Sequence, residues 1–351
     1  MNKPKQLRLL IFFSLCVLLA SILCNCSTKK TTTKYPFPAK LAWPAPPQKT
    51  RIRWITAFSR ESDIGGGSVT FWKKLVSFVV GRKEHRIIRP YGIYAFDGKV
   101  FVADPGARVV HLFDLKAKKY RLLSFSNNRR DMLACPIGIS GDGAGRLYLT
   151  DSQQKKIYTF SIGSYKLYTF ASRKFLRPTG IAYSKQNELV YVSDTLAHQI
   201  VGLDQHGVEQ IRFGGRGSAA GRLNYPTDLF IDDKGHIWVT DSMNFRIQAF
   251  TLDGKFITMF GEPGNTTGRF AKPKGVAVDS EGHIYVCDAL FDTVQIFDQT
   301  GLFLLNFGER GVGTGYFWMP SGLFIDSQDR IYVADTYNQR IQVFQYVRDE
   351  N

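Results

Sequence analysis

The sequence predicts an all-β fold: a six-bladed β-propeller of four-stranded antiparallel blades. Three observations support this prediction: a unit of about 47 residues occurs six times, each unit contains β-rich runs between Asp/Gly turns, and a lone strand-like run precedes the first unit. Of the 351 residues, 44% are hydrophobic and 14% aromatic, which suffices for a large core. This composition excludes a disordered, collagenous or disulfide-stabilised chain.

Two landmarks define the repeat. Each unit opens with a proline, followed two positions later by glycine in five of the six units, and the prolines are 46, 42, 48, 47 and 47 residues apart. About fourteen residues further on, a β-rich run ends in aspartate, and the aspartates are 47, 43, 47, 47 and 47 residues apart. Two landmarks that keep one period indicate a repeat architecture. The landmarks are Pro90, Pro136, Pro178, Pro226, Pro273 and Pro320, and Asp104, Asp151, Asp194, Asp241, Asp288 and Asp335.

The fifth unit shows the strands of one blade most clearly. Strands are expected at 276–278, 284–287, 294–297 and 303–307, separated by Asp/Gly turns. Short strands with such turns predict an antiparallel meander. Four-stranded meanders repeated around an axis form a β-propeller, which leaves only short, protected edges.

The two ends of the repeat region predict how the ring closes. The sixth unit contains only three strands, the last at 341–344, whereas residues 51–58 form a strand-like run without a unit of its own. We therefore expect this N-terminal strand to close the last blade as its outer strand. Without it, blade 6 would present an unpaired edge.

The repeat resembles a known family. The pattern Pro-x-Gly-Val-Ala-Val-Asp-Ser-x-Gly-x-Ile-Tyr-Val-x-Asp, followed by Asn-x-Arg-Ile-Gln-x-Phe, resembles the NHL repeat. Blades 4 and 6 have the Asn-x-Arg pair, as Asn244 with Arg246 and Asn338 with Arg340, whereas blades 1–3 lack it. The likeness covers about 51–351. It implies the fold but no particular activity, because this fold hosts enzymes, sensors and scaffolds.

The first residues predict export. Within 1–25, a basic stretch precedes an apolar run at 9–23, which is shorter than the roughly 20 residues that span a bilayer. Leu23-Cys24-Asn25-Cys26 resembles a bacterial lipoprotein processing site and implies lipidation of Cys26. An ordinary cleaved signal or an uncleaved anchor is the alternative. The Lys-, Thr- and Pro-containing segment 26–50 predicts a flexible tether.

These features predict a membrane-anchored lipoprotein of the bacterial cell envelope, on its periplasmic side or at the cell surface. The net charge of +16 belongs mainly to the N-terminal quarter, because residues 89–351 contain 30 basic and 27 acidic residues. We therefore expect no nucleic-acid partner. Within the propeller, 89–224 has 20 bases and 10 acids, and 225–351 has 10 bases and 17 acids, an asymmetry that can orient a monomer toward a partner.

The sequence provides little support for cofactor chemistry. Beyond the N-terminal segment it has only Cys135 and Cys287, without a CxxC or CxxCH motif, so no zinc, haem or other cofactor is expected. The six landmark aspartates are interpreted as turn residues that accept hydrogen bonds. Three Gly-rich loops (214–221, 261–268 and 308–315) are interpreted as connections between blades that need positive φ, and not as phosphate-binding loops.

A candidate binding surface surrounds the repeat prolines. The turns at these prolines and the loops after the second strands should share one face of the disc. Asp228 stands where five other units have glycine, and could add a carboxylate at the mouth of the channel. The candidate residues are Arg89, Tyr91, Lys155, Lys156, Arg177, Asp228, Lys272 and Lys274. They suit an acidic protein or a polysaccharide, although ordinary solvated charge is an equal alternative.

We therefore expect a binding or scaffold module for a protein or cell-envelope polymer, and not a catalyst. The alternative is a calcium-dependent lactonase- or lyase-like enzyme that uses the central channel. NHL-type lyases of the peptide-amidation kind have metal-binding histidines next to the repeat prolines, and this sequence lacks them. A helical insertion is expected at 68–82, a basic amphipathic segment that packs on the propeller or on a membrane.

Overall fold

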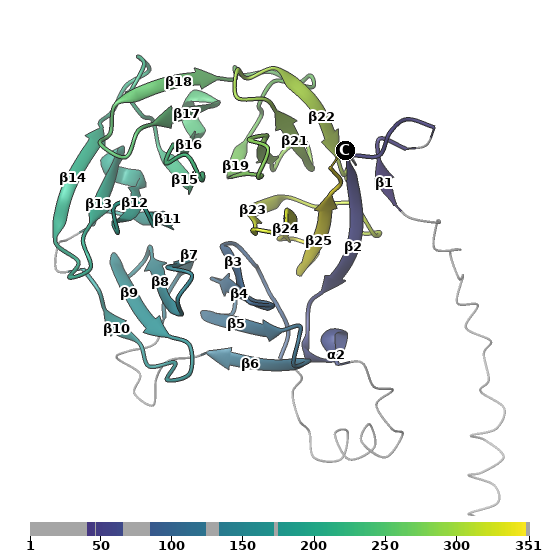
Figure 1. Cartoon of the computed structure of the whole chain (residues 1–351), viewed down its shortest axis with the longest axis horizontal. Helices are drawn as coiled ribbons and strands as arrows, with labels where there is room; N and C mark the ends of the chain where they lie inside the picture. Colours follow the sequence, from purple (N-terminus) through teal and green to yellow (C-terminus); the bar gives the residue numbers. More distant parts are fainter. Residues whose placement is uncertain (1–40, 46, 66–84, 124–132, 172–174, 349–351) are drawn as a thin grey trace, which may run out of the picture. The chain divides into compact units, whose positions relative to one another are not determined.

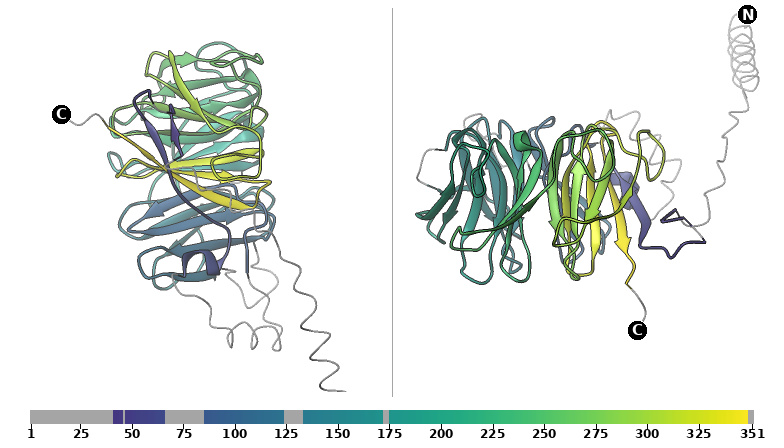
Figure 2. Two further views of the ribbon diagram at one scale, coloured as in Figure 1. Left: turned by 90° about the vertical axis from the view of Figure 1, so that its right-hand side faces the viewer. Right: turned by 90° about the horizontal axis from the view of Figure 1, so that it is seen from above.

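The computed structural model describes residues 41–45, 47–65, 85–123, 133–171 and 175–348. The unit Leu41–Asn351 forms a ring of six antiparallel sheets (Figure 1), which stand side by side as the blades of a disc (Figure 2). The predicted six-bladed propeller is confirmed. The export signal at 1–25, Cys26 and the helical insertion at 68–82 lie outside the described residues.

The first three blades each contain four strands. Blade 1 consists of β3 (Ile93–Phe96), β4 (Lys99–Asp104), β5 (Val109–Asp114) and β6 (Lys119–Leu123). Blade 2 consists of β7 (Pro136–Gly141), β8 (Arg146–Asp151), β9 (Lys156–Ser161) and β10 (Tyr168–Thr169). Blade 3 consists of β11 (Pro178–Tyr183), β12 (Val190–Asp194), β13 (Gln199–Leu203) and β14 (Glu209–Gly214).

The last three blades follow the same order, with the N-terminal strands in the sixth sheet. Blade 4 consists of β15 (Pro226–Ile231), β16 (Ile237–Asp241), β17 (Arg246–Phe250) and β18 (Phe256–Phe260). Blade 5 consists of β19 (Pro273–Val278), β20 (Ile284–Asp288), β21 (Thr293–Phe297) and β22 (Phe303–Phe307). Blade 6 consists of β23 (Pro320–Ile325), β24 (Arg330–Asp335), β25 (Arg340–Tyr346), β2 (Ile52–Phe58) and β1 (Ala42–Trp43).

Helix is confined to short segments in the described residues: α2 (Glu61–Ile64), η2 (Thr195–Ala197) and η3 (Ser242–Asn244). None of these described helices has the length and hydropathy needed to span a bilayer. Aspartates hold the first hairpins of several blades; in blade 5 the Asp279 carboxylate accepts hydrogen bonds from the Glu281 and His283 N–H groups at 3.0 and 2.9 Å. This turn chemistry explains the Asp/Gly clusters between strands.

The position of a strand within its blade determines its burial. Every residue of β20 and β21 is buried, because both faces of these middle strands pack against neighbouring blades. The outer strand β22 alternates between half-buried and exposed residues until its last residue, Phe307, because its outward side meets solvent. Near-continuous apolar runs inside and alternation outside are therefore the sequence pattern of one blade.

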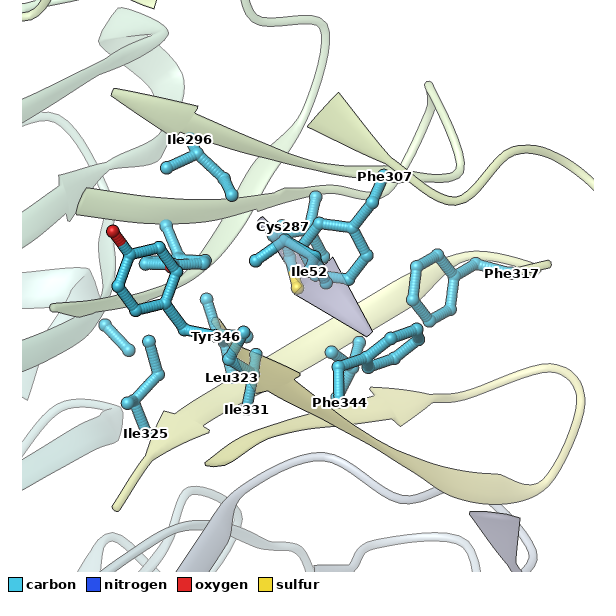
Figure 3. Packing of buried hydrophobic residues seen from close by; sticks show 14 residues of the cluster. Ile52, Cys287, Ile296, Phe307, Phe317, Leu323, Ile325, Ile331, Phe344 and Tyr346 are labelled. Atoms are coloured by element: carbon cyan, nitrogen blue, oxygen red, sulfur yellow. The ribbon is translucent and has the colours of Figure 1, made fainter. Parts of the chain in front are cut away.

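The predicted closure of the ring is confirmed. Strand β2 pairs antiparallel with β25, with Ile52 opposite Tyr346 and Phe58 opposite Ile341. Ile52 has no exposed surface and lies in the cluster that contains Phe307 and Phe344 (Figure 3). The last blade is also joined to the first, because the Thr336 hydroxyl donates a hydrogen bond to the Pro90 carbonyl at 3.0 Å.

Strand β1 was not anticipated, and it lies inside the segment 26–50 predicted as a tether. Ala42 and Trp43 pair with Arg53 and Ile52 of β2, which gives the sixth sheet a fifth strand. The Trp43 ring lies 5.9 Å from the Phe307 ring and 5.8 Å from the Phe344 ring, centroid to centroid. Partial burial of this large aromatic ring against the core explains why two residues suffice to hold the strand in place.

Candidate functional site

The aspartate that ends the second strand of each blade holds the turn before the repeat proline. In blade 1 the Asp104 carboxylate accepts hydrogen bonds from the backbone N–H groups of Ile88 at 2.6 Å and Arg89 at 3.0 Å. The predicted turn role is thus confirmed, and the proline turns and the loops after the second strands share one face, the Pro-turn face. The equivalent residues are Asp151, Asp194, Asp241, Asp288 and Asp335.

The eight candidate residues occupy two levels of this face. Arg89, Arg177, Lys272, Lys155 and Lys156 are exposed, whereas Tyr91, Asp228 and Lys274 are half-buried. Lys155 ends the turn before β9 in blade 2 and Lys156 is the first residue of β9, and no hydrogen bond or ion pair joins either lysine to the other candidates among the described residues. Arg89 lies over the ring of Tyr337, 5.8 Å from its centroid.

Three of these residues form a cation cluster: Arg177, Lys272 and Lys274. Burial, together with the charges of Lys272 and Arg177, lowers the pKa of Lys274 to about 8. The Lys274 ammonium lies 5.9 Å from the centroid of the Tyr91 ring, a distance compatible with a cation–π interaction. In the described part of the chain, no ion pair with a carboxylate involves any of the three cluster residues.

Below this face, the glycines of the Pro-x-Gly turns pack against the neighbouring blades. A Cβ atom added at Gly92 would lie only 2.3 Å from the Ile137 carbonyl oxygen, and one at Gly138 only 2.2 Å from that of Thr179. Only glycine therefore fits at these two positions. Blade 4 has Asp228 at this position, so a single carboxylate interrupts the ring of glycines. We call this level the neck of the channel.

Asp228 is an unusual carboxylate. Its Oδ2 atom accepts a hydrogen bond from the Val276 N–H, at a long 3.3 Å. Burial raises the pKa of Asp228 to about 7, although the N–H groups of Leu229 and Val276 oppose the rise. Tyr91 is affected in turn: burial first, and then the charge of Asp228, raise its pKa well above the usual value.

A cavity of about 660 Å³ extends from the neck to the opposite face of the disc. We call this opposite face the hairpin face, because it is formed by the turns between the first and second strands, such as 97–98 and 232–236. Aromatic side chains of three inner strands line the cavity: the Phe324 ring lies 5.3 Å from the Tyr94 ring and 6.4 Å from the Phe230 ring, centroid to centroid. We call these three residues the aromatic arc.

The aromatic arc was not predicted from the sequence, although a signal exists. Its members are the fourth residues after Pro90, Pro226 and Pro320, whereas the same position holds small residues in the other blades. The small residues are Ser140, Ala182 and Ala277. Of the small residues, Ser140 and Ala182 line the cavity, together with Tyr183.

The described residues of the neck and the cavity do not provide the oxygen ligands that a calcium-dependent enzyme needs. They contain no group of three or more His, Cys, Asp or Glu side chains arranged around a common point. Calcium takes six to eight oxygen ligands, and the neck offers one carboxylate, Asp228. No histidine is among the described residues that line the cavity.

Comparison with known proteins agrees with this architecture. The NHL repeat family model matches residues 223–250, 270–297 and 317–344, each of which spans the first three strands of one of blades 4–6. Among curated protein sequences, none matches the chain significantly. The protein is thus a six-bladed β-propeller, and the resemblance to the NHL repeat seen in the sequence is confirmed for blades 4–6.

Solved structures of similar fold have diverse descriptions. A virginiamycin B lyase from Staphylococcus aureus is 15% identical, with a TM-score of 0.54 over 74% of this chain and 95% of that one. An auxiliary nutrient binding protein from Bacteroides thetaiotaomicron is 16% identical, with a TM-score of 0.57 over 75% of this chain and 70% of that one. A nidogen/laminin complex contains a chain that is 17% identical, with a TM-score of 0.52 over 72% of this chain and 89% of that one. At these identities the likeness extends to the fold alone.

Proposed function

We propose that this protein is an exported, lipid-anchored binding module, which holds an acidic protein or an anionic cell-envelope polymer on its Pro-turn face. The observation that carries the proposal is the cation cluster. Three cations lie close together and have no carboxylate partner among the described residues. Their mutual repulsion, together with burial, lowers the pKa of Lys274. An anionic ligand would relieve this repulsion and accept hydrogen bonds from Arg177 and the two lysines.

The anchor is part of the proposal. Residues 1–25 would direct export, Cys26 would receive the lipid, and the segment that follows would hold the propeller near the membrane surface. Mass spectrometry of the mature protein should find an acylated N-terminal Cys26. An unmodified or uncleaved N-terminus would refute the anchor but not the binding face.

A binding experiment tests the face itself. The full chain in detergent is titrated with a polyuronate, a carboxylated polysaccharide, and with neutral dextran. We expect the polyuronate to bind and dextran not to bind, and the triple variant Arg177→Ala/Lys272→Ala/Lys274→Ala to bind the polyuronate at least about tenfold more weakly.

The matched control is Lys118→Ala/Lys119→Ala/Lys166→Ala, which removes the same charge from exposed lysines outside the cluster. If both triple variants lose affinity equally, only net charge matters and the proposed face is wrong. Affinity capture from the native envelope with the wild type and the two variants then identifies the natural partner, which should be missing from the cluster variant alone.

A further inference from the structure

The cavity on the hairpin side of the neck differs from the Pro-turn face in its charge. Its lining includes seven aspartates but only three basic residues, Lys116, Lys185 and Arg330. Three of the aspartates at the rim, Asp232, Asp279 and Asp326, hold hairpin turns. The Asp326 carboxylate, for example, accepts hydrogen bonds from the Arg330 N–H and the Tyr332 hydroxyl.

The carboxylates of three rim aspartates form ion pairs: Asp97 with Lys116, Asp326 with Arg330 and Asp329 with Arg348. Among the described residues, Asp232, Asp233 and Asp279 form no ion pair with a lysine or arginine, so the mouth of the cavity keeps a net negative charge that attracts cations.

The floor and wall of the cavity add two further requirements. Asp228 lies at the floor, where its only hydrogen bonds among the described residues come from backbone N–H groups. The aromatic arc belongs to β3, β15 and β23, which surround the channel at the centre of the ring (Figure 1). Phe230 and Phe324 are half-buried, so part of each ring remains accessible from the cavity.

We propose that this cavity binds a small organic cation, an alkyl- or arylammonium compound whose positive group lies near Asp228 and whose apolar part packs on Tyr94, Phe230 and Phe324. A carboxylate in a partly desolvated site attracts an ammonium group strongly, and nearby aromatic rings offer the apolar part contact area and the positive group a cation–π attraction. A volume of about 660 Å³ matches a ligand of drug-like size. The site is separate from the proposed polymer-binding face, because the neck lies between them.

Isothermal titration calorimetry of the full chain in detergent tests this inference. The probe is benzyltrimethylammonium, whose charge does not depend on pH, compared with neutral benzyl alcohol and anionic phenylacetate. We expect saturable binding of the ammonium compound only. Equal binding of benzyl alcohol would reduce the cavity to a hydrophobic pocket, and binding of phenylacetate or of none of the probes at millimolar concentration would overturn the proposal.

Variants locate the site. Asp228→Asn and Asp228→Gly, the second of which restores the glycine found in the other blades, should each weaken binding at least about tenfold, and Phe324→Leu about three- to tenfold. The control Asp253→Asn removes an equal charge from an exposed hairpin between β17 and β18 and should leave the affinity unchanged. Unchanged affinity in both Asp228 variants, with their folds verified by circular dichroism, would contradict the proposed role of this carboxylate.

Discussion

Asp228 is held in the neck in a way that favours its protonated form. Its pKa is raised by burial to about 7, from an ordinary value of 3.8, so the folded protein binds more protons than the unfolded chain between these two values. The free energy of unfolding that this group contributes therefore falls as the pH rises from about 4 to about 7. Above pH 7 the folded protein bears the full free-energy penalty of ionising a buried carboxyl group. The titratable groups that face Asp228 are Tyr91 and Cys287.

Asp228→Asn removes this cost. We expect the variant to gain free energy of unfolding relative to the wild type as the pH increases, by at most about 3 kcal/mol more at pH 8 than at pH 5. Urea denaturation of both proteins at the two pH values measures the difference. A gain that is equal at both pH values would show that Asp228 does not titrate in this range.

Lys274 offers a second titration at the residue scale. Burial, Lys272 and Arg177 all favour its neutral form, so it should deprotonate near pH 8 while ordinary exposed lysines remain charged. Reductive ¹³C-methylation followed by NMR should reveal one methyl resonance that titrates near pH 8 and that disappears in Lys274→Arg. In Arg177→Ala this midpoint should move upward; a midpoint that stays fixed would indicate that Arg177 is too distant to act.

At the scale of elements, the ring is closed by strand β2, which pairs with β25 although the two strands lie far apart in the sequence. Ile52 is fully buried, whereas Ile55 of the same strand lies at a bulge and is 47% exposed. We expect Ile52→Ala to lower the free energy of unfolding by about 2–5 kcal/mol, because it leaves a cavity in the core. Ile55→Ala, the matched control, should cost less than about 1 kcal/mol.

Denaturant unfolding of the two variants measures this contrast. Equal losses would show that the buried position of Ile52 contributes no more to stability than the exposed position of Ile55, and a negligible loss in Ile52→Ala would mean that the Ile52 side chain does not hold β2 in the core. The same variant should also show a less cooperative transition if closure of the ring links the first and last blades.

The elements differ in how far the sequence could predict them. The repeat period located the blades, and the absence of a fourth strand in the last unit predicted β2, because a propeller cannot leave an edge open. Strand β1 could not be predicted in the same way, because two residues have no periodicity of their own. Its position depends on the Trp43 ring meeting Phe307 and Phe344, which lie far away in the sequence.

The candidate site shows the same division. Tyr91, Asp228 and Lys274 could be selected because they occupy defined positions beside the repeat prolines. Phe230 and Phe324 are harder to select, because inner strands are apolar whether their side chains face a neighbouring blade or line the channel. The contrast with the small residues at the same repeat position is a signal, but it does not tell which way the side chains face. Only the closed ring brings these rings together.

At the scale of the whole molecule, the two ends of the channel carry opposite charge. The cation cluster lies on the Pro-turn face, the acidic cavity opens on the hairpin face, and the glycine-lined neck with Asp228 lies between them. If both proposals hold, we expect two ligands of opposite charge to bind at once, because they would use different groups. We expect saturating polyuronate to change the dissociation constant of benzyltrimethylammonium by less than about twofold, in either direction.

Salt should separate the two sites further. Exposed charges on the Pro-turn face are screened once the Debye length falls below about 10 Å, whereas a charge pair inside the cavity is screened much less. Raising sodium chloride from about 50 to 500 mM should thus weaken polyuronate binding at least about tenfold and amine binding only about two- to threefold. Calorimetric titrations at both salt concentrations test this expectation. Strict competition between the ligands, or an identical salt dependence, would mean that both use one surface, and the division of the channel at its neck would then have no role in binding.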